Sequence, residues 1–505
     1  MNIEIMDTTL RDGEQTSGVS FTDKEKYTIA KQLLTEVCVD RIEIASARVS
    51  KGEFEAVKQI MKWASKTGYI EKIEVLGFVD GTTSVDWIAE AGGKCINLLC
   101  KGSLKHLEGQ LKKTPQQHIN DIKTLVEYAS KKGICTNIYL EDWSNGMRSS
   151  HDYVLFFIES LKDTAIKRYM IPDTLGILSP NETYTFCKEM VTTFPQLHFD
   201  FHGHNDYDLA VANTMMAIDA GVKGIHTSVN GLGERTGNTT LSSIVPALKD
   251  LSKFTVNAKE QHLTQISKLV EVISGIRVAV NKPIIGENVF TQTAGIHADG
   301  DNKGNLYQSS LMPERFGRTR KYALGKTSGK ANIQKNLEEL GLDLDQDTII
   351  KVTNKVIELG DRKESITTED LPYIISEILG EMSTEDKIII NNYYIAHAKG
   401  LKPVATLSLE REGGIYQATS AGDGQYDAYM NALKMIYDQF TVNLPTLLDY
   451  IVTIPPGGKT DALVETIITW ELNGKTFKTR ALDPDQTAAA IKATTKMLNI
   501  LENQE

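Results

Sequence analysis

Cysteine is scarce in this chain of 505 residues, and its placement shows no metal-binding pattern. The five cysteines include no C-x-x-C pair, and most of them stand in apolar runs. Buried, reduced thiols fit this usage better than a disulfide framework or a cysteine-based metal site. We therefore expect a protein of a reducing compartment, the cytoplasm.

Long apolar runs are also missing. No uninterrupted apolar stretch approaches the roughly 20 residues that a membrane-spanning helix needs. The first residues, MNIEIMDTTLRDGEQ, lack the basic segment and apolar run of a secretory signal. We expect no membrane partner.

An excess of positive charge is absent too, since the formal net charge is −11. That balance argues against nucleic acid or an anionic membrane as the main partner. It leaves small anionic substrates open, because a local cationic pocket can sit on an acidic protein. The composition that is present, 41% hydrophobic and 24% charged, is ordinary for a globular enzyme.

The first 250 residues alternate short β-rich runs with amphipathic stretches, and this alternation repeats eight times. Strand followed by helix, eight times over, predicts a parallel sheet closed into a (β/α)8 TIM barrel, with an open doubly wound sheet as the alternative. The expected strands are 3–8, 41–46, 74–79, 95–100, 136–140, 168–172, 198–202 and 224–229. The expected helices between them include 23–36, 53–67, 115–132, 152–161, 180–193 and 208–220.

The pattern changes after the barrel. We expect a catalytic barrel over 1–255, mostly helical linker subdomains over 256–389, and an α+β regulatory domain over 390–505. In the last part, two strands around Glu412-Gly413 lead into a helix, and about 60 residues later two strands around Asn473-Gly474 do the same. The regulatory domain is therefore predicted to be an internal repeat.

Chemically reactive residues gather where barrel strands end. In a TIM barrel the active site is built at the carboxyl ends of the strands. Five such clusters fall on that rim, at 7–15, 141–142, 173–174, 202–206 and 231–238. The reactive groups are therefore expected to share one cleft.

His202-Gly203-His204 predicts a metal site at the end of strand seven. Two histidines separated by one residue on a strand face the same side, and two imidazoles aimed into one cavity suit a divalent cation. Asp12 and Asn238 on neighbouring loops would complete a mixed nitrogen and oxygen site for Zn, Mn, Co or Mg. The alternative is a pair of histidines that merely hydrogen-bond the rim.

Three further rim residues have chemical roles open to them. Arg11 can bind a carboxylate or stabilise an alkoxide, or be a surface ion pair. Glu141 can act as acid or base or be a solvated carboxylate, and Thr174 can donate to a substrate carboxylate or cap a helix.

The glycine-rich loop at 231–237 does not match a dinucleotide-binding fingerprint, because Thr236 stands at the last glycine position and no βαβ unit follows.

With these motifs together, the chain resembles the metal-dependent barrel family that contains 2-isopropylmalate, homocitrate and citramalate synthases. The matching segments are DTTLRDGEQ (7–15), HGHND (202–206), GLGERTGN (231–238) and TAGIHAD (293–299), and the resemblance covers essentially the whole chain. It implies Asp12, His202, His204 and Asn238 as metal ligands, Arg11 as the group that polarises the keto oxygen, Glu141 and Thr174 as keto-acid contacts, and His297 and Tyr307 as residues that reach into the partner subunit of a crossed homodimer and assist proton transfer.

The family chemistry implied is a Claisen condensation of acetyl-CoA with a small 2-keto acid. By resemblance, Leu76, Leu99 and Tyr139 wall the keto-acid side chain. This bulky, largely apolar wall favours pyruvate over 2-ketoisovalerate, and it contains no cation for the second carboxylate that a homocitrate synthase would bind. Packing alone discriminates by only about 1–3 kcal/mol per methylene.

The C-terminal repeat resembles the amino-acid-sensing domain of these synthases. The residues that resemble its pocket for a branched aliphatic amino acid, isoleucine or leucine, are Tyr426, Asp427, Tyr450, Ile454 and Val464. A plain dimerisation module is the alternative for this domain. For the whole chain the rivals are a carbon–carbon lyase or aldolase on the same barrel, and a non-catalytic scaffold.

Overall fold

The computed structural model describes residues 1–293, 300, 304, 306, 309–340, 342–361, 366, 368–379, 388–440, 442–453 and 464–502. The chain folds as two compact units. The first comprises Met1–Thr291 and Gln308–Arg320, and the second comprises Gln292–Tyr307 and Lys321–Glu505. Among the described helices, none has the length and apolarity to cross a membrane. All five cysteines are free thiols.

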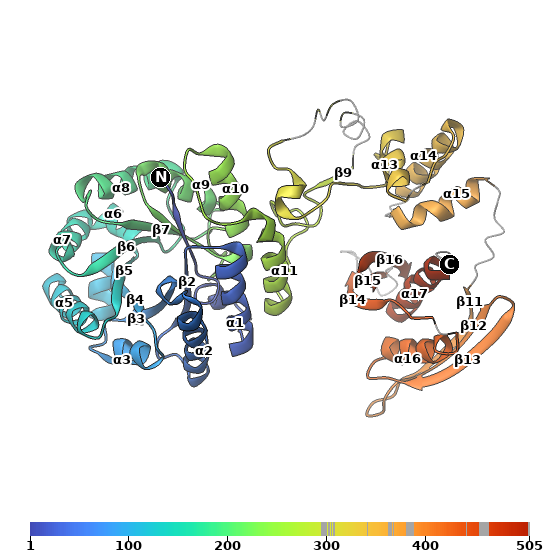
Figure 1. Cartoon of the computed structure of the whole chain (residues 1–505), viewed down its shortest axis with the longest axis horizontal. Helices are drawn as coiled ribbons and strands as arrows, with labels where there is room; N and C mark the ends of the chain where they lie inside the picture. The colour runs from blue at the N-terminus through green and yellow to red at the C-terminus, as the bar shows by residue number, and fades with distance from the viewer. Residues whose placement is uncertain are drawn as a thin grey trace. The chain divides into compact units, whose positions relative to one another are not determined.

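The first unit, with the barrel strands β2 to β7 labelled in Figure 1, is a closed barrel of eight parallel strands in sequence order. Strand β1 pairs with β8 and closes it. Its strands are β1 (Glu4–Asp7), β2 (Arg41–Ser46), β3 (Ile73–Phe78), β4 (Cys95–Lys101), β5 (Cys135–Glu141), β6 (Ile166–Asp173), β7 (Phe199–Gly203) and β8 (Gly224–Thr227). This confirms the predicted (β/α)8 barrel.

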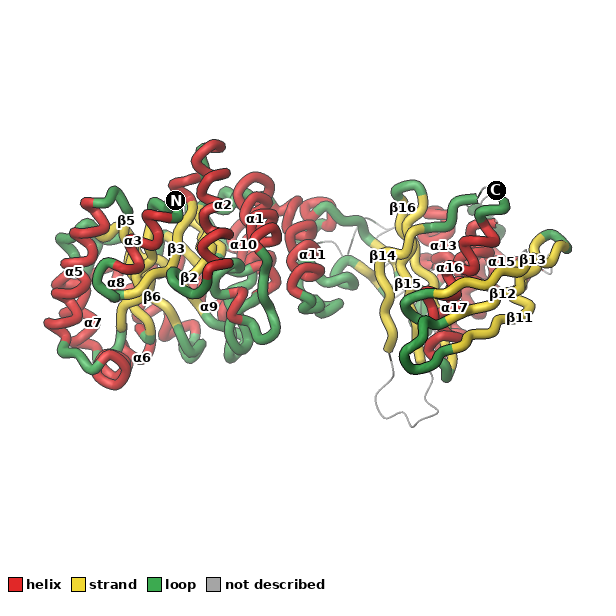
Figure 2. Tube along the Cα trace, turned by 90° about the horizontal axis from the view of Figure 1, so that it is seen from below, coloured by secondary structure: helices red, strands yellow, loops and turns green. Residues whose placement is uncertain are grey.

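Helices form the outer layer around these strands (Figure 2). They are α1 (Asp23–Gln32), α2 (Lys51–Thr67), α3 (Thr83–Glu90), α4 (Leu104–His106), α5 (Pro115–Lys131), α6 (Trp143–Ser149), α7 (His151–Leu161), α8 (Pro180–Thr193), α9 (Ala210–Ala220), α10 (Leu241–Leu251) and α11 (Leu263–Ser274). Their starts follow local rules. Thr22 caps α1 in a capping box with Glu25, and Ser179 caps α8 in the same way with Glu182.

The interior of the barrel is unusually polar. Branched aliphatic side chains usually fill this space, but here Asn137 donates to Asn97 at 2.9 Å and Asn97 donates to Glu43 at 2.8 Å. Arg41 pairs with Glu74 at 2.8 Å and also with Asp200. The buried charges of Arg41, Glu74 and Asp200 thus have opposite partners, which offsets the cost of removing them from water.

The second unit begins with a helical part. Strands β9 (Thr291–Gln292) and β10 (Lys321–Tyr322) pair, and helices α13 (Lys330–Leu340), α14 (Gln346–Asp361) and α15 (Leu371–Leu379) share a small apolar core. Its residues include Ile333, Leu337, Val352, Val356 and Leu371. All three helices lie within 256–389, the part that the sequence predicts to be mostly helical.

The rest of the second unit is an internal repeat of three antiparallel strands and a helix. The first copy is β11 (Ile388–Ala396), β12 (Val404–Arg411), β13 (Gly414–Ala421) and α16 (Gln425–Tyr437); the second is β14 (Thr446–Thr453), β15 (Val464–Leu472), β16 (Lys475–Asp483) and α17 (Gln486–Glu502). The turn residues Glu412-Gly413 and Asn473-Gly474 all have positive φ, as two-residue hairpin turns of this type require.

The first strand of each copy, β11 and β14, is absent from the sequence prediction. Both are edge strands, and both carry a register shift, between Ile390 and Asn392 and between Leu447 and Asp449. Most of their side chains are exposed or half-buried, so no clean alternation of apolar and polar residues marks them.

The buried carboxyl of Asp7, at the end of β1, is expected to make the stability of the folded chain depend on pH. Burial raises the pKa of its carboxyl from 3.8 to about 6, against the lowering effect of its hydrogen bond from Thr9. A raised folded-state pKa means that the folded chain loses stability as the pH rises from about 4 to about 6. We expect Asp7→Asn to abolish this loss, so the variant gains up to about 3 kcal/mol on the wild type across this window.

The measurement is the unfolding midpoint of both proteins at several pH values. Asp219→Asn, at an exposed position of α9, is the control and should track the wild type throughout. A constant difference between Asp7→Asn and the wild type from pH 4 to pH 7 would contradict the assignment.

Candidate active site

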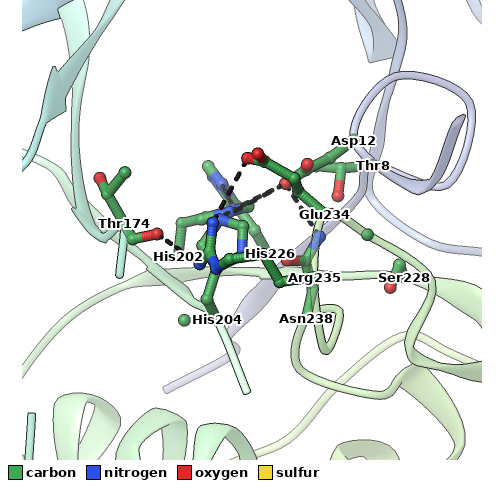
Figure 3. A network of polar contacts seen from close by, with 12 residues as sticks. Thr8, Asp12, Thr174, His202, His204, His226, Ser228, Glu234, Arg235 and Asn238 are labelled. Atoms are coloured by element: carbon green, nitrogen blue, oxygen red, sulfur yellow. Dashed lines mark hydrogen bonds and ion pairs between the residues drawn. The ribbon is translucent and has the colours of Figure 1, made fainter. Parts of the chain in front are cut away.

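Asp12, His202 and His204 each present one ligand atom, and these atoms lie within 4.8 Å of one another. Asp12 follows β1, whereas the two histidines come from the end of β7, one residue apart, and therefore face the same side. Asp12 Oδ2 lies 3.1 Å from His202 Nε2 and 3.9 Å from His204 Nε2, and the two Nε2 atoms are 3.2 Å apart (Figure 3). All three side chains are buried.

Asn238 completes this cluster from the loop after β8. Its Nδ2 donates to Asp12 Oδ2 at 2.9 Å, while its buried Oδ1 has no hydrogen-bond partner among the described residues. The loop needs glycine just before it: Gly237 has a φ of +85°, and an added Cβ would meet the carbonyl oxygen of Gly231 at 1.8 Å. The glycines of this loop therefore serve a tight turn that presents Asn238.

The charge state of the cluster suits a divalent cation. Burial lowers the pKa of His204 to about 4 and also lowers that of His202, so both imidazoles are neutral at pH 7. Burial alone would raise the pKa of Asp12, but the neighbouring Arg11 guanidinium holds it well below its usual value. One carboxylate, two neutral imidazoles and an orphaned amide oxygen form a mixed set that fits Mn, Co, Zn or Mg.

Arg11 stands next to this cluster. Its Nε donates to Glu43 Oε2 at 2.5 Å, and its Nη1 lies 3.6 Å from Asp12 Oδ1. Burial disfavours its charge, but the two carboxylates outweigh that effect and raise the pKa of Arg11. Its guanidinium therefore stays cationic beside Asp12, and its Cζ lies 5.7 Å from the ring centre of Tyr139.

The three wall residues expected from the sequence come together inside the barrel. Leu76 and Tyr139 form a buried apolar cluster with Met6 and Met170, and the half-buried Leu99 packs against it. The hydroxyl of Tyr139 is a polar group in this wall, and it lies 3.3 Å from Glu43 Oε2.

The rim also holds a cation that the sequence reasoning missed. Lys101 is the last residue of β4, two residues beyond Leu99 and on the same face of the strand, and its Nζ pairs with the carboxylate of Glu141. Period-two alternation from Leu99 was the signal that could have found it. Because the pair is neutral as a unit, Lys101 adds no net charge to the wall.

Thr174 and the loop after β8 are braced together. Thr174 Oγ1 accepts from the backbone N–H of Asp142 at 2.9 Å, and this bond does not use the hydroxyl hydrogen of Thr174. Arg235 binds both carboxylate oxygens of Asp206, at 2.8 and 2.9 Å, and donates to the carbonyl oxygen of Thr174 at 2.8 Å. Figure 3 shows Thr174 and Arg235 beside the histidines.

A family model described as HMGL-like matches residues 2–270, one described as homocitrate synthase post-HMGL domain-like matches 284–364, and the LeuA allosteric (dimerisation) domain matches 365–502. A probable 2-isopropylmalate synthase of Methanopyrus kandleri is 33% identical over 99% of this chain and 98% of its own length. The (R)-citramalate synthase of Methanocaldococcus jannaschii is 32% identical over 100% of both chains.

The chain belongs to the HMGL-like family. Within it, the chain is an acyltransferase of the citramalate and 2-isopropylmalate synthase type. The 2-isopropylmalate synthase of M. jannaschii is also 32% identical, over 100% of this chain and 95% of its own. Among solved structures, a Bacillus subtilis HMG-CoA lyase covers 56% of this chain and 97% of its own, at 21% identity and a TM-score of 0.49.

Some expected residues lie outside the part of the chain that the structure describes. They are His297 and Tyr307, expected to assist proton transfer, and Ile454, expected in the effector pocket. In the C-terminal repeat, the rings of Tyr426 and Tyr450 stack at 5.4 Å.

The other two residues of the expected effector pocket have local roles. Asp427 accepts from the backbone N–H of Asp423 at 2.8 Å within its own turn. Val464 is buried at the first residue of β15.

Substitution of Asp12 tests whether the cluster binds a divalent cation. We expect Asp12→Asn to weaken binding of Mn2+ to the full chain by more than about tenfold, because it removes the only anionic ligand atom of the set. Isothermal titration with MnCl2 measures this affinity.

His151→Gln is the control, since His151 is a half-exposed histidine outside the cluster, paired with Glu189 on the barrel surface. Equal affinity in Asp12→Asn and the wild type would show that the cation binds elsewhere.

Proposed function

We propose that the chain joins acetyl-CoA to pyruvate by a Claisen condensation and releases (R)-citramalate and free CoA. The observation that carries this proposal is the placement of the Asp12 cluster and the Arg11 guanidinium beside the wall of Leu76, Leu99 and Tyr139. The family relationship supports the reaction type, and the wall supports the choice of keto acid.

Different side chains of the site are proposed to bind different groups of the keto acid. A divalent cation held by Asp12, His202, His204 and Asn238 would act as a Lewis acid toward the carbonyl and carboxylate oxygens of the keto acid. Arg11 stabilises the negative charge that develops on the carbonyl oxygen. The hydroxyl hydrogen of Thr174 donates to the keto-acid carboxylate.

The bond-making steps need a base near the methyl group of acetyl-CoA. Glu141, oriented by Lys101, and His297 are the groups proposed for removing this proton. The resulting enolate carbon attacks the keto carbon, and the keto oxygen becomes the hydroxyl of the product. Water then cleaves the thioester to give a carboxylate and the CoA thiol, which makes the reaction irreversible in practice.

The wall argues for a small side chain on the keto acid. Leu76 and Tyr139 are buried within one apolar cluster, so they cannot swing away to admit a branched group without loss of packing. The second candidate is 2-isopropylmalate synthase, which uses 2-ketoisovalerate, because relatives of equal similarity bear that name. A carbon–carbon lyase on the same barrel is disfavoured by the match to the allosteric domain.

We also propose a homodimer that senses a branched-chain amino acid, isoleucine if the product is citramalate and leucine if it is isopropylmalate. The match of residues 365–502 to the LeuA allosteric (dimerisation) domain supports this. The proposed pocket includes the stacked rings of Tyr426 and Tyr450.

The test of the condensation is release of free CoA, followed with a thiol reagent, from acetyl-CoA, MnCl2 and a panel of 2-keto acids. We expect pyruvate to have the highest kcat/KM, and Leu99→Ala to raise the ratio for 2-ketoisovalerate over pyruvate by about 10- to 100-fold, because it removes bulk from the wall. The control is Leu98→Ala, since Leu98 lies on the opposite face of β4 and its loss should leave the ratio unchanged.

A wild-type preference for 2-ketoisovalerate would keep the reaction and reject the wall argument. No CoA release with any keto acid would reject the condensation.

The effector proposal has its own test. We expect isoleucine to inhibit CoA release by the full chain, and Tyr450→Ala to weaken this inhibition by more than about tenfold with the uninhibited rate unchanged, because a stacked aromatic wall of the pocket is lost. The measurement is the isoleucine concentration that halves the rate.

Tyr394→Ala, at an exposed position of β11, is the matched control. Inhibition of Tyr450→Ala at wild-type concentrations of isoleucine would place the effector elsewhere.

A further inference from the structure

His226 is a buried histidine of β8 that the reaction described above does not use. Its side chain is fully removed from solvent and projects into the barrel. Three polar groups surround its ring: His202 Nδ1 at 3.3 Å from Nδ1, Tyr139 OH at 3.2 Å from Nδ1, and Asp200 Oδ2 at 3.4 Å from Nε2. No predicted motif includes it.

The first step concerns His202. Its Nε2 faces Asp12 Oδ2 at 3.1 Å and His204 Nε2 at 3.2 Å, so this is the atom turned to the metal cluster. A neutral imidazole that offers the lone pair of Nε2 carries its hydrogen on Nδ1. In His202 that hydrogen points at His226 Nδ1, which must accept it.

The second step concerns the ring of His226. To accept at Nδ1, His226 must carry its own hydrogen on Nε2, and this atom faces Asp200 Oδ2. Asp200 is buried and ion-paired with Arg41, so it is a fixed anionic acceptor for that hydrogen. The hydrogen bonds therefore run in one direction, from His202 to His226 to Asp200.

Tyr139 does not compete for this acceptor. Its hydroxyl lies 3.3 Å from Glu43 Oε2, a carboxylate oxygen that also receives Arg11. Donation to a carboxylate is stronger than donation to a neutral imidazole. The hydrogen of Tyr139 thus goes to Glu43, and the lone pair of His226 Nδ1 stays available to His202.

We propose that His226, backed by Asp200, is a positioning residue that locks His202 in the tautomer whose Nε2 lone pair faces the metal. The inference rests on the proposed metal site, and it adds an outer partner of the kind that orients metal-bound histidines elsewhere. The ring of His226 thereby connects the buried ion pair of Asp200 and Arg41 to the metal cluster.

The test uses the full chain and MnCl2 alone. We expect His226→Leu, which has no acceptor, to weaken Mn2+ binding by about 10- to 100-fold. His226→Asn retains an oxygen near the position of Nδ1, and we expect its affinity to stay within a few-fold of the wild type. Isothermal titration gives the affinities, and circular dichroism checks the fold.

Rescue by asparagine separates hydrogen bonding from packing. If the leucine variant binds Mn2+ as tightly as the wild type, or if leucine and asparagine weaken binding equally, the positioning role is wrong. Should the leucine variant fail to fold, His226→Phe, which keeps a ring without an acceptor, takes its place with the same expectations.

Asp12→Asn distinguishes this inference from the metal site itself. Wild-type affinity in Asp12→Asn would remove the site on which the inference rests. Weakened binding in Asp12→Asn together with wild-type binding in His226→Leu would leave the metal site standing and overturn only the role of His226.

Discussion

One carboxylate oxygen, Asp12 Oδ2, is the point on which the site converges. His202 and His204 reach it from the end of β7, and Asn238 reaches it from the loop after β8. Asp12 remains anionic inside the barrel because Arg11 stands beside it, and Arg11 is fixed in turn by Glu43. Without this balance of buried charges the carboxylate would protonate, and the cluster would lose its only anionic ligand atom.

That balance explains why the barrel interior is polar. Burying ion pairs gives little net stability, since desolvation cancels much of the attraction. The interior pairs of Arg41 with Glu74 and Asp200, and of Arg11 with Glu43, therefore serve orientation more than folding strength. The apolar side chains packed between strands and helices stabilise the fold, and the ion pairs of the polar interior orient the side chains at the rim.

The sequence predicts those parts of the molecule that depend on local pattern. Strand alternation predicts all eight barrel strands, and the motifs place Asp12, His202, His204 and Asn238 on one rim, where the structure brings them together. Lys101 could have been found from its position two residues beyond Leu99, but its pairing with Glu141 depends on another strand. His226 escaped because its significance lies in His202 on another strand, and no local pattern marks such a pair.

A missing turn signal rather than distant pairing hid two strands of the repeat. Strands β11 and β14 each carry a register shift, and the burial of their side chains follows no strict period of two. In each copy, the two-residue turn between the second and third strands predicts both of them, whereas no local pattern predicts the first strand.

The Lys101–Glu141 pair bears on the size and charge of the proposed substrate. A keto acid with a second carboxylate needs a free cation near its far end, and Lys101 stands close to the wall residue Leu99. Yet Lys101 is already neutralised by Glu141, and a second carboxylate could reach it only by displacing that partner into a half-closed rim. Displacement would leave one partly buried carboxylate without its counter-charge, which opposes binding of the second carboxylate. Under the proposed function, the same pair that orients Glu141 therefore also rejects dicarboxylic keto acids, so a small monocarboxylic substrate is favoured by charge as well as by packing.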